Sequence, residues 1–259
     1  MNESTKQSNP EKPTGNASLA LPIHKKIWWL CMAGGAGFWA LALILWAQQG
    51  IDQAVLFYFD PARVSGAPIV VFSKWLSGNG MAAITVIFVL YLLASKVIKW
   101  LDASPTFYVF TFCSFGLSGI AGDLLKEVFA RPRPVTTFGS EIFVWSQSVT
   151  PAIPSGHAVK SIALILPFVL LVPSSNWVHK TIKVVITLTA AGVCLSRIIL
   201  GAHYLSDVVA GVGMALIGLP FTILFANMIL KRMPRERLPF LSWVWGLLLV
   251  FLIWVFSAL

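Results

Sequence analysis

The chain has 259 residues, of which 57% are hydrophobic and only 11% are charged, and its formal net charge is +9. Soluble domains carry about 25% charged residues, so this composition excludes the soluble class and indicates a chain whose main solvent is lipid. The 19 Lys and Arg residues form no basic face with interleaved aromatic side chains, which excludes a nucleic-acid-binding protein.

The first 26 residues differ in composition from the rest of the chain. They are polar and contain Pro, Gly, Ser and Asn, so we expect residues 1–26 to form a tail without a core. The apolar segment that follows has no small-residue cleavage signal and has the length of an uncleaved first span. Residues 27–259 are therefore predicted to form a single transmembrane domain.

Seven apolar segments follow in chain order. A helix needs about 20 apolar residues to cross a hydrocarbon core of about 30 Å. The segments that approach this length are 27–47, 81–98, 107–122, 155–172, 182–200, 205–230 and 240–259. They predict an all-α, polytopic transmembrane helical bundle with six core spans and a seventh, C-terminal span. Between the first two spans, Phe57-Tyr58-Phe59 and residues 72–76 are predicted to lie at the membrane surface.

The positions of the cysteines and of the basic residues indicate the role of the thiols and the orientation of the chain in the membrane. Cys31, Cys113 and Cys194 lie in different apolar segments, so they are expected to be packing residues rather than disulfide partners or metal ligands.

Lys and Arg concentrate on the side of the N-terminus, which predicts a cytoplasmic N-terminus. Residues 124–154 and 201–204 then emerge together on the opposite, outer face, where a lipid phosphate would lie.

Most polar residues outside the cytoplasmic side fall in three clusters. The first runs from Lys126 to Pro134 and contains Arg133, the second is Pro154-Ser-Gly-His157, and the third runs from Ser196 to Asp207. A phosphoryl transfer needs cations around the phosphate oxygens, a nucleophile in line with the leaving group and an acid for the leaving oxygen. Together the clusters contain candidates for each of these roles.

The first set of candidates would bind the phosphate. Lys126, Arg133 and Arg197 supply three cations, and guanidinium groups suit bidentate contact with phosphate. Ser155 and Gly156 precede an apolar helix, so their backbone N–H groups and the helix dipole are predicted to form an anion cradle.

The second set would carry out covalent chemistry and proton transfer. His203 and Asp207 are four residues apart, so on a helix they share one face and the carboxylate can hold one imidazole nitrogen protonated. The other nitrogen can then attack phosphorus. His157 has no acidic residue at helical spacing and is the candidate for the acid that protonates the leaving group.

In order and spacing, the three clusters resemble the three-part signature of the type 2 phosphatidic acid phosphatase superfamily, which also includes bacterial lipid phosphatases, glucose-6-phosphatases and vanadium haloperoxidases. The resemblance spans about residues 80 to 230 and fills every signature position. It implies a metal-independent enzyme without a cofactor, in which His203 becomes phosphorylated, Asp207 orients it and His157 is the general acid. The residues that it implies bind phosphate are Lys126, Arg133, Ser155, Gly156 and Arg197.

The resemblance leaves several functions open. We expect a lipid phosphatase in a bacterial inner membrane with its site facing the periplasm. Its substrate could be undecaprenyl diphosphate, phosphatidylglycerophosphate, phosphatidate or lipid A. Phosphotransfer from a prenyl diphosphate to lipid A uses the same intermediate and is an alternative. A haloperoxidase is a weaker enzymatic alternative. A non-catalytic lipid carrier is an alternative from another functional class. The oligomeric state is not predicted.

Three further charged residues have two interpretations each. Asp123 either pairs with Lys126 or is an interfacial carboxylate at a helix end. Arg131 either contacts substrate head groups or anchors the chain at the interface. Lys160 either reaches a second phosphate or head group, or extends to the interface.

Overall fold

The structure, a computed structural model, describes residues 25–98, 105–144, 150–172, 174–232, 240 and 243–251. Within these ranges the chain is helical and contains no strand. The helices are α1 (Lys25–Gln48), α2 (Gly50–Tyr58), α3 (Asp60–Ser65), α4 (Pro68–Val97), α5 (Pro105–Phe129), α6 (Pro134–Phe138), α7 (Gly156–Leu171), α8 (Trp177–Ile199) and α9 (Leu205–Arg232), with a 3-10 turn η1 (Gly139–Glu141) after α6.

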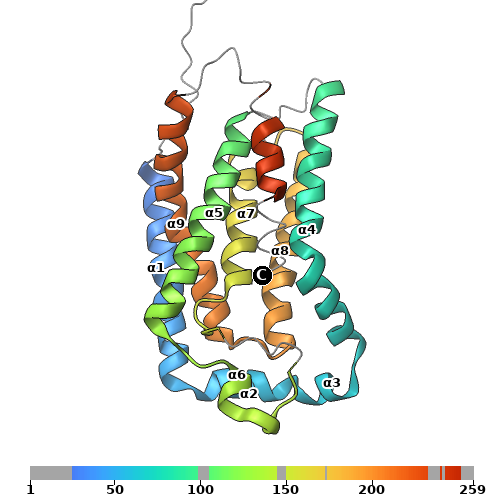
Figure 1. The fold of residues 1–259 in the computed structure, drawn as a ribbon, viewed down its shortest axis with the longest axis vertical. Helices are drawn as coiled ribbons and strands as arrows, with labels where there is room; N and C mark the ends of the chain where they lie inside the picture. The colour runs from blue at the N-terminus through green and yellow to red at the C-terminus, as the bar shows by residue number, and fades with distance from the viewer. Residues whose placement is uncertain are drawn as a thin grey trace, which may run out of the picture.

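Six long helices form an up-and-down bundle (Figure 1). Helices α1, α4, α5, α8 and α9 lie in the segments that are long and apolar enough to cross a membrane, and α7 is a shorter apolar helix. The short helices α2, α3 and α6 lie across one end of the bundle (Figure 1). At this end α1, α5 and α8 terminate and α4, α7 and α9 begin, so it collects the three clusters singled out in the sequence.

Proline and glycine residues set the bounds of the short helices. Pro residues stand in the first turns of α3, α4 and α6, where the missing N–H is not needed for helix hydrogen bonds. Gly66 ends α3 in the left-handed conformation, with φ 64°. The chain therefore turns sharply at the end of the bundle and returns into α4.

Close backbone contacts at glycine hold α9 against its neighbours. A Cβ atom on Gly213 would lie 2.8 Å from the carbonyl oxygen of Gly35 in α1. A Cβ atom on Gly211 would lie 2.9 Å from the carbonyl oxygen of Ser155, at the start of α7. Small residues thus let the first turns of α7 and α9 approach each other, as is common between membrane helices.

The core on the other side of the bundle is aromatic. Phe88, Phe107 and Phe168 come from α4, α5 and α7 and are buried together. The rings of Phe88 and Phe168 stack with centroids 5.3 Å apart, and Phe107 meets both rings edge to face. This cluster joins the three helices away from the end that carries the polar clusters.

Most of the predicted spans are confirmed as helices, but α5 ends at Phe129 rather than at 122, α8 begins at Trp177 rather than at 182, and the predicted start of α4 is wrong. Residues 72–76 do not lie along the surface but belong to α4, which begins at Pro68 and not at Met81. The glycines at 78 and 80 do not interrupt this helix. At Gly80 a Cβ atom would lie 2.4 Å from Val193 Cγ2, so the residue serves close packing against α8. Phe57 and Tyr58 lie in α2 across the end of the bundle, as predicted.

The two ends of the chain are described only in part. Lys25 and Lys26 belong to α1 rather than to the predicted tail, and residues 1–24 lie outside the described residues. In the predicted seventh span, residues 243–251 are helical, while 241–242 and 252–259 lie outside the described residues.

The glycine contacts predict a difference between two neighbouring positions in α1. Gly35 faces α9, where an added Cβ would lie 2.5 Å from Ile217 Cγ1, whereas nothing lies within 4 Å of a Cβ on Gly34. Gly35→Leu should therefore destabilise the protein by about 1–3 kcal/mol through overpacking. Its midpoint of thermal unfolding in detergent should fall, while that of the matched control Gly34→Leu should not. Equal midpoints would contradict the close α1–α9 contact.

Candidate active site

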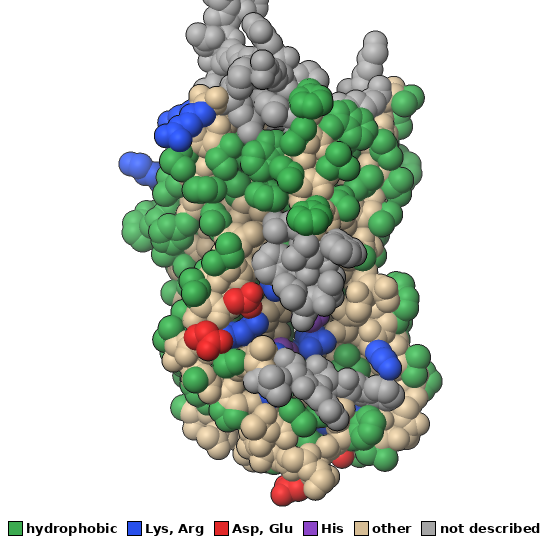
Figure 2. Space-filling view, viewed as in Figure 1, with side chains coloured by type: hydrophobic (Ala, Val, Ile, Leu, Met, Phe, Trp, Pro, Cys, Tyr) green, Lys and Arg blue, Asp and Glu red, His purple; other side chains and the backbone are tan. Residues whose placement is uncertain are grey.

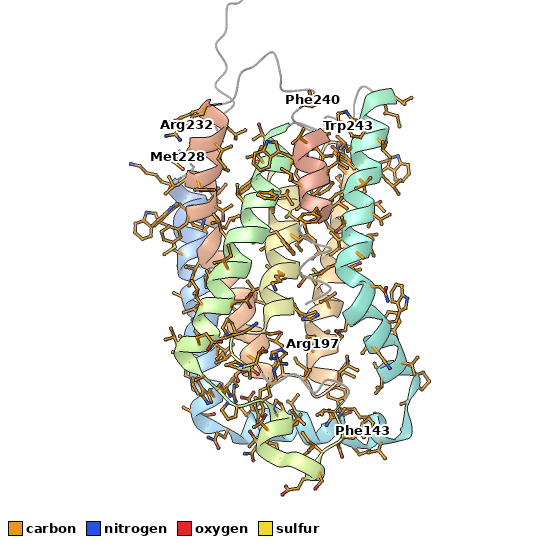
Figure 3. The ribbon with its side chains drawn as sticks, viewed as in Figure 1. Phe143, Arg197, Met228, Arg232, Phe240 and Trp243 are labelled. Carbon is orange, nitrogen blue, oxygen red and sulfur yellow. The ribbon has the colours of Figure 1, made fainter. Side chains whose placement is uncertain are left out.

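All eight residues singled out for chemistry lie at the end of the bundle where α2, α3 and α6 cross. They come from the end of α5, the segment before α6, the start of α7, the end of α8 and the turn into α9. Arg197 points from α8 into this region (Figure 3). Figure 2 shows basic and histidine side chains together in the lower half of one face, beside an acidic one.

His203 and Asp207 lie in contact, as their spacing predicted. His203 follows the end of α8, and its backbone N–H donates to the carbonyl oxygen of Arg197 at 3.2 Å. Its Nδ1 lies 3.4 Å from Asp207 Oδ2, and this oxygen also accepts the N–H of Tyr204 at 2.9 Å. Nε2 lies 3.3 Å from Nη1 of Arg133, which can only donate. The lone pair is therefore on Nε2, and the proton on Nδ1 faces the carboxylate.

The surroundings of His203 keep its imidazole neutral. The side chain is buried, and burial lowers the pKa of His203 well below its ordinary value. The positive charges of Arg133, Arg197 and Lys126 lower this pKa further. At neutral pH the ring is therefore in its basic form, which is the form that can attack phosphorus.

Neutral groups hold the guanidinium groups of Arg133 and Arg197. Arg133 donates to the carbonyl oxygen of Thr150 at 2.7 Å, to its hydroxyl at 2.9 Å and to the carbonyl oxygen of Ala202 at 3.2 Å. Arg197 donates to the hydroxyl of Ser77 at 2.5 Å. Among the described residues, neither guanidinium has a carboxylate within 4.0 Å. Both charges are thus available to a bound anion.

The start of α7 supplies further polar groups. Ser155 donates its backbone N–H to the carbonyl oxygen of Asp207 at 2.9 Å, so the prediction that this amide faces a phosphate is wrong. Its hydroxyl is instead buried without a partner among the described residues, as is Nε of Arg197. Gly156 is the first residue of α7, so its N–H has no acceptor within the helix. A Cβ atom there would lie 3.1 Å from Nζ of Lys126.

Lys126 and Asp123 form an ion pair, which confirms the first of the two interpretations of Asp123. Nζ of Lys126 lies 2.6 Å from Asp123 Oδ1, and Nζ of Lys160 lies 3.7 Å from Oδ2 of the same carboxylate. The Asp123 side chain is 42% exposed, so the pair lies at the edge of the site. The partly exposed carboxylate offsets only part of the charge of the two lysines.

His157 completes the set from α7. It is the second residue of α7 and directly follows Gly156, where a Cβ atom would lie 3.1 Å from Nζ of Lys126, so His157 lies at the same end of the bundle. Two histidines distant in sequence therefore share one site at one end of the bundle, which is the arrangement that the proposed chemistry requires.

The structure contradicts the interpretation of Arg131 as an interfacial anchor, whereas its contact with substrate head groups stays a prediction. Its side chain is buried and forms ion pairs with Asp52 Oδ2 at 2.9 Å and with Asp207 Oδ1 at 2.7 Å. Asp52 lies in α2 and was not singled out in the sequence. Asp52 precedes Arg131 by 79 residues and Asp207 by 155, and no local sequence pattern connects residues so far apart. Only the fold shows that Asp52 belongs to the site.

Comparisons with known proteins place all three clusters within one family match. The model of the PAP2 superfamily matches residues 104–234. Over 118 residues the chain is 30% identical to a lipid A 1-phosphatase of Rhizobium etli, covering 44% of this chain and 45% of the relative. It is 29% identical to one of Rhizobium johnstonii over 118 residues, covering 44% and 43%. The chain thus spans about half the length of the curated relatives it matches.

A solved structure shares the fold. The crystal structure of a transmembrane PAP2 type phosphatidylglycerolphosphate phosphatase from Bacillus subtilis matches with a TM-score of 0.58 and 20% identity. The match covers 80% of this chain and 100% of that one. Because the family model spans half of the chain and includes all three clusters, the chain belongs to the PAP2 superfamily.

Proposed function

We propose that the protein is an integral membrane phosphatase that removes phosphate from a lipid phosphate ester or diphosphate through a phosphohistidine on His203. The observation that carries this proposal is the environment of that imidazole. It is buried and neutral, it is oriented by Asp207, and its Nε2 lies beside Arg133, whose charge has no carboxylate partner among the described residues. A neutral nucleophile beside unpaired cations suits attack on a phosphate anion.

In the first step the phosphate oxygens bind to Arg133, Arg197 and Lys126, with the hydroxyl of Ser155 and the N–H of Gly156 as further donors. Nε2 of His203 attacks phosphorus while the bond from phosphorus to the leaving oxygen breaks. A proton from His157 goes to that oxygen, so the leaving group departs as an alcohol or as a protonated phosphate. Asp207 stabilises the positive charge that develops on the imidazole.

In the second step water replaces the histidine. His157, now neutral, takes a proton from water as the oxygen attacks phosphorus, and the bond from phosphorus to Nε2 breaks. Inorganic phosphate leaves and both imidazoles return to their first state. The side chains themselves supply the positive charge around the phosphate, so we propose that the reaction needs no metal ion.

The two ends of the bundle support the proposed orientation and the proposed substrate class. Lys25, Lys26, Lys231 and Arg232 lie at the end opposite the site, which favours a cytoplasmic location for that end. The site then faces the periplasm at the depth of lipid head groups. Because two relatives are lipid A 1-phosphatases, a phosphate of lipid A is the first substrate to test.

A lipid panel tests this proposal. The purified protein should release phosphate from lipid A, phosphatidylglycerophosphate, phosphatidate or undecaprenyl diphosphate in detergent. Release should persist in EDTA and be inhibited by vanadate. A labelled prenyl diphosphate supplied with unlabelled lipid A distinguishes the alternative, because label on the second lipid would show phosphotransfer. Absence of release from every lipid would overturn the proposal.

Substitution of the two histidines separates their roles. His203→Ala should abolish phosphate release and leave no phosphorylated protein. His157→Ala should lower kcat by about 10²–10⁴ through loss of acid and base catalysis. With a substrate whose leaving group needs no protonation, this variant should accumulate a phosphorylated protein that acid hydrolyses. Undiminished turnover by His203→Ala would disprove its assignment as nucleophile.

The pH dependence of kcat/KM tests the neutral state of His203. Because its pKa lies below the ordinary value of about 6.5, activity should persist as the pH falls through that value and be lost only at lower pH. Arg133→Gln removes a charge that lowers this pKa, so the acidic limb should move to higher pH. Lys180→Gln, an equal charge change at the opposite end, should leave the limb in place. The substrate's own ionisation is common to all three proteins.

A further inference from the structure

Asp207 is bound through both of its carboxylate oxygens. Oδ2 faces Nδ1 of His203 at 3.4 Å and accepts the N–H of Tyr204 at 2.9 Å. Oδ1 accepts Nη1 of Arg131 at 2.7 Å. The direction in which Oδ2 meets the imidazole therefore depends on Arg131, which holds the other end of the same carboxylate.

Arg131 is in turn held by Asp52. Nη2 of Arg131 donates to Asp52 Oδ2 at 2.9 Å, and Nη1 also donates to the hydroxyl of Ser206 at 2.5 Å. Asp52 Oδ1 accepts the backbone N–H of Ser206 at 2.9 Å, and Asp52 Oδ2 accepts the hydroxyl of the same residue. A carboxylate from α2 therefore sits at the first turn of α9, where the helix dipole favours it. Asp52, Arg131, Ser206 and Asp207 form one connected network.

Packing alone does not fix the guanidinium of Arg131. Its Cζ lies 4.1 Å from the ring centroid of Tyr204 and 5.2 Å from that of Trp46. Beside it is a cavity of about 200 Å³, which these two rings, Arg131 and Asp52 help to line. With space on that side, the two carboxylates determine where the guanidinium lies.

We propose that Asp52 and Arg131 are positioning residues that act on catalysis through Asp207. This inference rests on the proposed function and extends it to the interfacial helix α2. Within the described part of the chain, the hydrogen bonds of both side chains go to each other, to Ser206 and to Asp207, so neither touches the reacting atoms. Through Arg131, α2 holds the carboxylate in the orientation that presents Nε2 of His203 to the phosphate.

A second ion pair at the same end of the bundle provides a matched control. Arg63 in α3 lies 3.2 Å from Asp60 and is also buried. Its other hydrogen bonds go to the carbonyl oxygens of Leu56 and Ile199. The pair therefore connects α3 with its neighbours, and among the described residues it makes no hydrogen bond or ion pair with Asp207. Its loss should affect stability without affecting kcat.

The test is a double-mutant cycle on kcat with the lipid that the wild type hydrolyses. Arg131→Gln should lower kcat about 100-fold through misplacement of the dyad, with KM within about two-fold. In the Asp207→Asn background the same substitution should change kcat by less than about two-fold, because the group it acts through is already lost. Equal losses in both backgrounds, or a loss confined to KM, would overturn the inference.

Asp52→Asn gives a milder version of the same cycle. It keeps Arg131 paired with Asp207, so the buried charges remain balanced and the variant remains testable if Arg131→Gln does not fold. It should lower kcat by about 10-fold in the wild-type background and not in Asp207→Asn. Asp60→Asn should lower the unfolding midpoint and leave kcat unchanged. An inactive wild type would instead refute the proposed function, so the two failures are distinguishable.

Discussion

The structure depends on positive charge that is buried at one end of the bundle without matching carboxylates. Arg63, Arg131 and Lys126 each pair with an aspartate. Among the described residues, Arg133 and Arg197 instead contact only neutral groups, which are carbonyl and hydroxyl groups and, for Arg133, the imidazole of His203. Burial of an unpaired charge is unfavourable, so the fold must hold these two side chains with neutral dipoles and with the bundle around them. In the proposed function, a dianionic phosphate supplies the missing negative charge. The site should therefore be most stable when it is occupied.

Arg131 and Arg133 lie two residues apart but have different partners, and we propose different roles for them. Arg131 and Arg133 both precede a proline, which favours an extended backbone at each. In an extended chain, residues two apart point to the same side. Arg131 thus contacts the carboxylate of Asp207 while Arg133 faces Nε2 of His203. The short segment before α6 therefore contacts both members of the His203–Asp207 pair, since Arg131 binds the carboxylate and Arg133 lies beside the imidazole.

Local chemistry explains how much of this could be predicted from the sequence. His203 and Asp207 were predicted to meet because a spacing of four is a local property. The contact forms, although α9 begins at Leu205 and His203 therefore meets Asp207 from the turn before the helix. The cationic residues were found because their chemistry and spacing match a known signature. Asp52 was missed because its partners come from other segments of the chain, and the pairing of Arg131 with two carboxylates was missed for the same reason. The start of α4 was placed too late because Gly80 lies inside this helix, and the sequence does not show its packing against α8.

The amide of Ser155 shows how a helix start can serve two functions. The sequence predicted that this N–H would bind phosphate, but it donates to the carbonyl oxygen of Asp207. That bond, together with the close approach at Gly211, ties the start of α7 to the start of α9. The first turn of α7 carries His157, and the turn into α9 carries His203. The hydrogen bond that occupies this amide therefore fixes the proposed nucleophile relative to the proposed acid. The buried Ser155 hydroxyl remains as a proposed phosphate donor.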